Sequence, residues 1–183
     1  CADTPGFIAN RIGGFWMAAA VNEALRLGID IETRYQGLES PAKLKLAVTG
    51  CPRNCAEALC KDFGVVAIGD GKWEIYVGGA AGAHIRKGDL LCVVGSHDEA
   101  LKIMGRFMQY YRETAKWKER TYSYVERIGI AKLRSVVVDD SEGISERLDK
   151  AMQESIDAYR DPWLEGQNPA TPNQFTSLVP VEG

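Results

Sequence analysis

The sequence lacks several features that mark common functional classes. It has no apolar run of about eighteen residues, the length that a helix needs to cross a bilayer, and no signal peptide at its start. Its net charge of −3 is small and mixed in sign, so neither nucleic acid nor an anionic membrane is indicated as a partner. It also has no internal repeat and no low-complexity tract. We therefore expect a cytoplasmic protein.

Cysteine is scarce and unevenly distributed. Three of the five cysteines lie close together, at Cys51, Cys55 and Cys60. An odd number with this clustering favours thiolate ligation in a reducing compartment over a disulfide framework. The remaining composition is ordinary: 183 residues, 45% hydrophobic and 26% charged, suit one well-cored domain.

A predicted strand leads directly into the first two of these cysteines. Leucine and valine alternate with other residues over Leu44–Val48, which indicates a strand with one buried face. Cys51 and Cys55 come next, at C-x3-C spacing in a polar turn that contains Arg53 and Asn54. A single free cysteine is most often a small buried hydrophobe. Two of them in a polar turn instead favour metal or cluster ligation.

The rest of the chain predicts an α/β (α+β) domain. A small mixed β-sheet is covered by helices, with a helix before it and an irregular arm over residues 164–183 after it. The expected strands are Leu44–Val48, Phe63–Ile68, Lys72–Val77 and Leu90–Val94. The expected helices are Ile8–Leu27 ended by Gly28, Asp98–Lys116, Tyr122–Ile128, Lys132–Val137, and a last one capped by Ser141 and ended by Pro162.

Residues 29–163 resemble the siroheme-dependent nitrite and sulfite reductases. The resemblance rests on the T-G-C-P-R-N-C motif at Thr49–Cys55, the A-E-A after it, a hairpin, and the G-G-A-A-G segment Gly78–Gly82. It is closest to the large subunit of the NAD(P)H nitrite reductase. It implies one half of a pseudo-symmetric reductase core, a 4Fe–4S cluster, siroheme, and the six-electron reduction of nitrite to ammonia. The implied partners are the remainder of the large subunit and a small subunit.

The resemblance also implies roles for individual residues. Cys51 and Cys55 would be cluster ligands, because such clusters are held by four thiolates, and Cys55 would bridge to the siroheme iron. Cys60 would pack without ligating. Further cofactor contacts are implied for Arg53, Asn54, Gly78, Gly79, Arg86 and Lys87. Taken without the family, Gly78–Gly82 favours an ordinary mobile connection, and the resemblance is what favours cofactor contact there.

The chain departs from this family near its start. The family places a C-x5-C pair shortly before the segment matched by Leu27–Ile29, yet only Cys1 precedes Cys51. Residues 1–28, with ADTPGFIANRI, instead resemble the start of the C-terminal domain of 3-hydroxyacyl-CoA dehydrogenases, which implies a substrate-carbonyl contact for Asn10. We therefore expect a division into 1–28, 29–163 and 164–183.

Three functions remain open from the sequence. The first is a reductase fragment that is inactive by itself. The second is a metal- or cofactor-binding module without turnover, and the third is the remnant of a dehydrogenase fusion. Because the segment 1–28 resembles another family, we expect it to contribute little to the stability of residues 29–163.

Overall fold

The computed structural model describes the backbone of residues 8–161 and the side chains of residues 22–161. Four strands form the central sheet: β1 (Leu46–Thr49), β2 (Phe63–Gly69), β3 (Lys72–Val77) and β6 (Asp89–Val94). They lie in the order β1-β2-β3-β6, with β1 parallel to β2 and the other neighbours antiparallel. This confirms the predicted small mixed sheet. The expectations for residues 164–183, Pro162 and the side chain of Asn10 lie outside the described residues.

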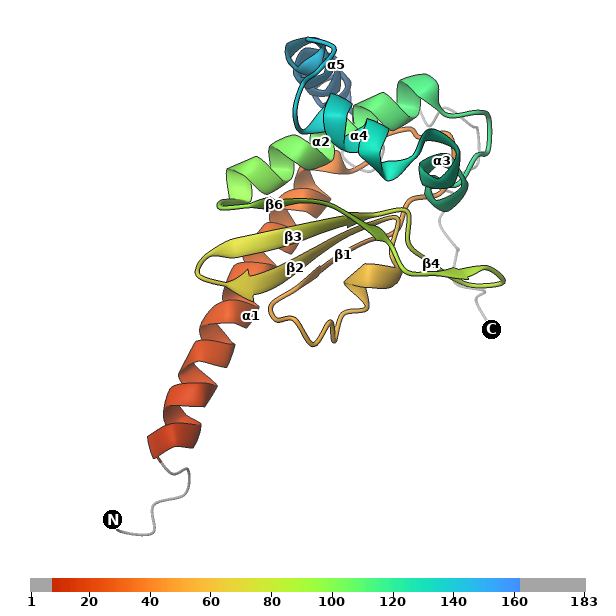
Figure 1. The fold of residues 1–183 in the computed structure, drawn as a ribbon. Helices are drawn as coiled ribbons and strands as arrows, with labels where there is room; N and C mark the ends of the chain where they lie inside the picture. Colours follow the sequence, from red (N-terminus) through yellow and green to blue (C-terminus); the bar gives the residue numbers. More distant parts are fainter. Residues whose placement is uncertain (1–7, 162–183) are drawn as a thin grey trace, which may run out of the picture.

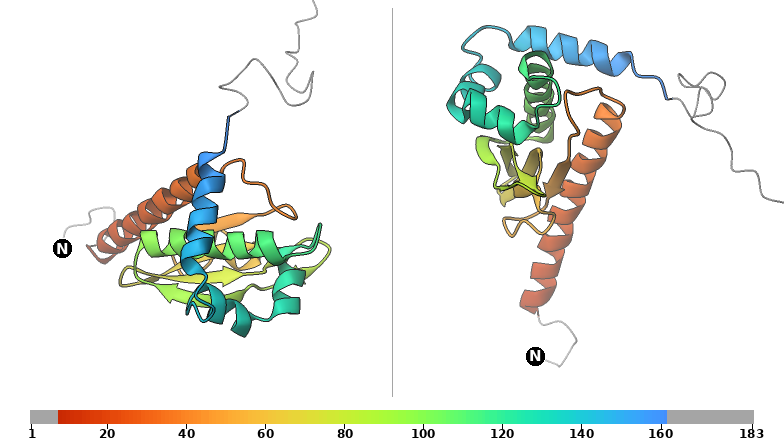
Figure 2. Two further views of the ribbon diagram at one scale, coloured as in Figure 1. Left: turned by 90° about the horizontal axis from the view of Figure 1, so that it is seen from above. Right: turned by 90° about the vertical axis from the view of Figure 1, so that its right-hand side faces the viewer.

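Helices cover one face of this sheet. Helices α2 (His97–Thr114), α3 (Thr121–Ile128) and α4 (Ile130–Val137) lie above it in Figure 1, and α5 (Ser145–Asp157) crosses the outside of α2 (Figure 2). Helix α1 (Ile8–Tyr35) runs along the β1 edge. The core between these layers is apolar: Phe63, Val65, Ile75, Leu91, Met104, Phe107, Met108 and Tyr111 are all buried. No helix within residues 8–161 is long and apolar enough to cross a membrane.

Helix α1 is longer than the sequence predicts. Gly28 does not end it, since the helix continues to Tyr35. The reason is packing: Leu27, Ile31 and Tyr35 recur at helical spacing and are all buried, which outweighs the roughly 1 kcal/mol that an interior glycine costs. The left-handed glycine just beyond the end of the helix is instead Gly37, with φ +68°.

This packing also bears on the expected stability of the segment 1–28. Leu27 is fully buried in the same core cluster as the sheet and α2, and Ala24 beside it is buried as well. The end of the segment 1–28 is therefore part of the main core. The burial of these two residues argues against a small contribution of the segment to stability, an expectation that stays a prediction.

Two further local predictions are corrected. Ser141 does not cap the last helix, because α5 begins at Ser145 and its first N–H is bonded by the carboxylate of Asp140 (2.9 Å). The glycine-rich segment is not a plain loop, since Ala80–Ala81 (β4) and Ile85–Arg86 (β5) pair as a small antiparallel ribbon. Strands of two residues are too short to leave a signal in the sequence.

The connection between β1 and β2 positions the cysteines. Parallel neighbours need a crossover connection, which is usually a helix. Here residues 50–62 make it, with one 3-10 turn, η1 (Ala58–Cys60). Figure 1 shows this segment on the side of the sheet away from α2. It approaches β2 closely: a Cβ on Gly64 would lie 2.0 Å from the carbonyl oxygen of Ala58.

Candidate functional site

The segment that carries the cysteines, residues 50–60, is called the thiol turn. Its backbone forms successive hydrogen-bonded turns. The N–H of Asn54 donates to the carbonyl of Cys51 (3.2 Å), that of Glu57 donates to Asn54 (2.9 Å), and that of Cys60 donates to Glu57 (3.0 Å). Cys51 and Cys55, which follow β1, therefore lie on a backbone segment that is stabilised by its own hydrogen bonds.

Asn54 fixes the conformation of this turn. Its backbone is left-handed, with φ 57°, a region that asparagine tolerates better than most residues. Its side-chain oxygen accepts a hydrogen bond from the N–H of Leu59 (3.2 Å). The predicted hydrogen bond from the Asn54 side chain to a cluster sulfur would come from its amide N–H₂ group, because sulfur is an acceptor and the side-chain oxygen cannot donate.

Cys55 lies beside a large apolar groove. The side chain of Cys55 is exposed, and that of Cys51 is half-buried. The groove has a volume of about 720 Å³ and runs between α1 and β1. It is lined by Ala24, Leu25, Gly28, Ile29, Ile31, Glu32, Leu44, Leu46, Ala47, Val48, Thr49, Gly50, Cys55 and Ala56. Leu25 and Ile29 are 59% and 52% exposed, so a large apolar surface adjoins an accessible thiol.

Cys60 faces a different space. It lines a cavity of about 220 Å³, called the ribbon cavity, between the thiol turn and the β4–β5 ribbon. The other lining residues are Lys45, Asp62, Gly79, Ala80, Ala81, Gly82, Ala83, His84, Arg120 and Tyr122. Cys55 is absent from this lining and Cys60 from that of the groove. The two thiols are thus separated although they are close in sequence.

Arg86 is committed to contacts within the chain. Its guanidinium donates to Asp89 (2.7 Å), Glu126 (3.0 Å) and the carbonyl of Gly78 (2.8 Å), and its side chain is 17% exposed. Lys87 lies over the ring of Tyr76, 5.8 Å from its centre. Of the predicted basic contacts, Arg86 therefore holds the ribbon, while Arg53 in the thiol turn is exposed.

Gly78 and Gly79 are required by the packing of the chain itself. Gly78 has φ +74°, and a Cβ there would lie 2.8 Å from Val125. A Cβ on Gly79 would lie 2.6 Å from the carbonyl oxygens of Leu59 and Lys61. Gly78 thus lies against α3 and Gly79 against the end of the thiol turn, which is sufficient reason for the absence of side chains at both positions.

Asp62 organises the site, and sequence reasoning missed it. Its carboxylate is 1% exposed and accepts hydrogen bonds from the N–H of Lys45 (2.8 Å), from Arg120 (3.0 Å) and from the hydroxyl of Thr121. These donors come from segments far apart in the sequence, so no local pattern marks the residue. The network joins β1, the thiol turn and the start of α3.

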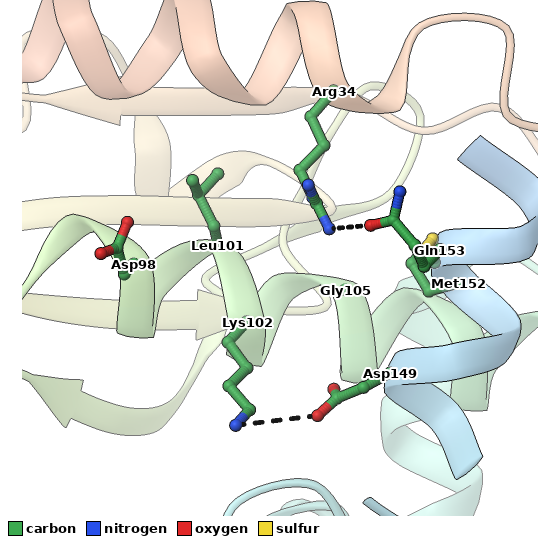
Figure 3. Close-up of a pocket in the computed structure, with 8 residues that line it drawn as sticks. All are labelled: Arg34, Asp98, Leu101, Lys102, Gly105, Asp149, Met152 and Gln153. Atoms are coloured by element: carbon green, nitrogen blue, oxygen red, sulfur yellow. Dashed lines mark hydrogen bonds and ion pairs between the residues drawn. The ribbon is translucent and has the colours of Figure 1, made fainter. Parts of the chain in front are cut away.

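A third cavity, of about 340 Å³, lies between α1, α2 and α5 (Figure 3). Two polar contacts lie along it: the guanidinium of Arg34 donates to the side-chain oxygen of Gln153 (2.8 Å), and Lys102 forms an ion pair with Asp149 (3.8 Å). Asp149 also accepts two hydrogen bonds from Arg106, which raise the pKa of that guanidinium. We interpret this cavity as a polar junction between helices.

The described thiols fit part of a cluster site. Residues 22–161 contain no group of three or more His, Cys, Asp or Glu side chains placed to hold a metal ion. Cys92 lies on β6, where burial raises the pKa of its thiol to about 11, so it is a poor thiolate ligand. Cys51 and Cys55 can therefore supply two of the four thiolates of a cluster. The described residues do not fit a complete one.

The comparison with known families gives this partial site its context. Residues 13–145 match the family described as "Nitrite and sulphite reductase 4Fe-4S domain". The chain belongs to this family. Membership assigns an iron–sulfur cofactor to the region and confirms the resemblance found in the thiol turn.

Relatives in this family include nitrite and sulfite reductases. The chain is 43% identical to the nitrite reductase [NAD(P)H] of Bacillus subtilis over 152 residues, 83% of this chain and 18% of that protein. It is 34% identical to the nitrite reductase (NADH) large subunit of Escherichia coli over 92% of this chain and 20% of that one. It is 37% identical to the assimilatory-type sulfite reductase of Nitratidesulfovibrio vulgaris over 73% and 58%. The chain spans about a fifth of the length of the two nitrite reductases.

The division of the chain at residues 28 and 29 stays a prediction. The family match begins at residue 13, inside the segment expected to be dehydrogenase-like, and α1 is continuous through Gly28. The division therefore falls in the middle of one helix. The dehydrogenase resemblance of residues 1–28 is likewise a prediction.

Proposed function

We propose that this chain is the cluster- and siroheme-facing part of a nitrite reductase that reduces nitrite to ammonia with six electrons. The observation that carries the proposal is the pairing of an exposed Cys55 with the apolar α1–β1 groove, in a family defined by its 4Fe–4S domain. Two of the relatives are nitrite reductases, which favours nitrite over sulfite as the substrate.

The thiol turn would hold two corners of the cluster. In this proposal the thiolates of Cys51 and Cys55 would hold the cluster, and Cys55 would be the ligand on the siroheme side. When bound, the cluster would supply the electrons for the reduction. Asn54 keeps the two thiols in place through its bond to Leu59, and the positive charge of Arg53 favours the anionic cofactor.

The glycine ribbon would shape the siroheme side of the same region. Gly79 allows the chain to lie against the thiol turn and Gly78 allows it to lie against α3, and Arg86 ties the ribbon to Asp89 and Glu126. Lys87 lies just after the ribbon, and its ammonium group would pair with a carboxylate of the macrocycle. We propose that these four residues position or contact siroheme in this way.

The proposal includes partners and a location. The exposed Leu25 and Ile29 in the groove suit coverage by the remainder of a reductase large subunit, and a small subunit is a further partner. We place the protein in the cytoplasm, without nucleic-acid or membrane partners.

A hybrid enzyme tests this function. Residues 29–145 of this chain replace the corresponding segment of the Bacillus subtilis nitrite reductase, which provides the rest of its own chain. We expect the hybrid to form ammonia from nitrite. Cys55→Ser in the hybrid should reduce the rate at least a hundredfold, because a shared cluster ligand is lost.

The matched control is Cys60→Ser, which faces the ribbon cavity and should keep most of the activity. A soluble hybrid that binds its cofactors but forms no ammonia would show that the proposal is wrong. So would a Cys55→Ser hybrid as active as its parent.

A metal-binding module without turnover is the second candidate. It is favoured by one observation, that residues 22–161 hold no group of three or more His, Cys, Asp or Glu side chains placed to bind a metal ion, so the ligand set is incomplete. The hybrid discriminates the two, because a module without turnover would yield an inactive hybrid that still binds metal.

A further inference from the structure

The ribbon cavity has an excess of positive charge. Lys45 and Arg120 both line it, and Asp62 offsets only one of them. Lys45 uses its backbone N–H, not its ammonium, to bond Asp62, and within residues 22–161 the ammonium has no partner. The lining thus carries one net positive charge before His84 is counted.

The guanidinium of Arg120 also has unused hydrogen-bonding capacity. Its Nη2 atom donates to both oxygens of Asp62, at 3.2 and 3.0 Å. Its Nε is buried and has no hydrogen-bond partner among the described residues. Buried donors are nearly always satisfied, so an orphan beside a cavity indicates a group that the chain alone does not supply.

The opposite wall of the cavity suits a small ligand. Gly79–Ala83 contribute no side chain larger than a methyl group, so the ligand can approach the backbone. The ring of His84 is stacked on that of Tyr122, with 4.5 Å between their centres, which fixes both polar rings at the rim. At roughly 30 Å³ per water, 220 Å³ holds about seven waters. A group of four or five heavy atoms fits in this space.

We propose that the ribbon cavity binds a small oxoanion or a carboxylate group through the ammonium of Lys45 and the guanidinium of Arg120. Asp62 holds Arg120 in position without neutralising Lys45, and both cations favour an anion with several oxygen atoms. This site is distinct from the cysteine ligands, because Cys51 and Cys55 do not line it. It does not depend on the reductase function.

Titration of the full chain with sulfate, phosphate and acetate tests this site. The backbone amides of residues 79–84 are followed by NMR while sodium chloride keeps the ionic strength constant, with no iron or siroheme present. We expect shifts that saturate and are confined to the cavity. Saturation by acetate alone would assign a carboxylate, and saturation by sulfate or phosphate an oxoanion; both support the proposal.

Lys45→Gln is the discriminating variant and Lys43→Gln its control. Both lysines are exposed and two residues apart, but only Lys45 lines the cavity. The affinity should fall about fivefold to tenfold in Lys45→Gln and remain unchanged in Lys43→Gln, since one ammonium contact is lost. Shifts that never saturate, or equal affinities in the two variants, would overturn the proposal.

Cys60 provides a second readout. Because it lines the cavity, the bound anion should slow its alkylation by N-ethylmaleimide, a neutral reagent, at least threefold. Cys55 faces the groove and should react at an unchanged rate. Equal slowing of alkylation at Cys60 and Cys55, or no slowing at either, would contradict the anion site. Failure of this experiment leaves the hybrid-enzyme test of the reductase function unaffected.

Discussion

At the scale of single residues, Asp62 connects the thiol turn to the rest of the domain. Its buried carboxylate accepts hydrogen bonds from Lys45, Arg120 and Thr121. Asp62→Asn keeps the volume but removes the charge that Arg120 faces. Breaking a buried pair in this way should lower the free energy of unfolding by about 3 kcal/mol. Urea denaturation measures the loss.

Asp70→Asn is the matched control for this variant. Asp70 is exposed in the β2–β3 turn with φ 50°, a conformation that asparagine also adopts, so the free energy of unfolding should change by less than about 0.5 kcal/mol. If Asp62→Asn lowers the free energy of unfolding no more than Asp70→Asn does, the Asp62 network is not important for stability.

Glu119 makes the stability depend on pH. Arg127 donates two hydrogen bonds to its carboxylate (2.7 and 2.6 Å), which lowers the pKa of Glu119 to about 2, with further help from the N–H of Lys116. A lowered pKa in the folded state stabilises the protein above the ordinary pKa, and this contribution is lost as the pH falls from about 4.5 towards 2.

Glu119→Gln should therefore lower the free energy of unfolding by about 1.5 kcal/mol at pH 7. The difference from the parent should shrink as the pH falls below about 4.5. Urea denaturation at a series of pH values measures it, with the exposed Glu39→Gln as control. A difference that is constant from pH 7 to pH 3 would exclude this role for the ion pair.

Sequence alone identifies some residues of the site and not others. Cys51 and Cys55 stand out because their spacing is local and their residue type is scarce. Asp62 and Arg120 do not, because their contact joins residues far apart in the chain. Arg86 stands out as a cation close to the glycines, but its bonds to Asp89 and Glu126 depend on the fold.

At the scale of elements, α1 offers a test of how packing overrides propensity. Gly28 lies inside the helix, and nothing lies within 4 Å of a Cβ built there. Gly28→Ala should therefore raise the free energy of unfolding by about 0.5–1 kcal/mol, because alanine favours the helix and restricts the unfolded chain. Thermal and urea denaturation measure the gain.

Gly37→Ala should instead lower the free energy of unfolding. Gly37 has φ +68°, and a Cβ there would lie 2.0 Å from the ring of Tyr159. A higher free energy of unfolding in Gly37→Ala, or a lower one in Gly28→Ala, would show that α1 does not continue through Gly28 and end before Gly37.

The elements show which sequence signals are reliable. The hairpin of β2 and β3 is predictable almost to the residue, because alternation and the Gly69–Gly71 turn both lie within it. The end of α1 is not, since Ile31 and Tyr35 continue the helix only by packing on the core. The β4–β5 ribbon has two-residue strands, which are too short to show a period.

At the scale of the whole molecule, we predict that this chain by itself does not reduce nitrite. Within residues 22–161 only two ligands are predicted, Cys51 and Cys55, and a 4Fe–4S cluster needs four thiolates. Purified chain incubated with reduced methyl viologen should show no nitrite-dependent oxidation above a protein-free blank. Steady turnover would mean that the chain completes its own site.

The most direct test of the cofactor assignment is the iron content after anaerobic reconstitution with iron and sulfide. The parent chain should retain iron in less than full occupancy, with a broad thiolate-to-iron absorbance that a chelator removes, since two thiolates hold it weakly. Cys60→Ser should behave like the parent, and Cys55→Ser should lose both the iron and the absorbance. If Cys55→Ser retained iron as well as the parent while Cys60→Ser failed, the assignment of the cofactor to the thiol turn beside the apolar groove would be contradicted.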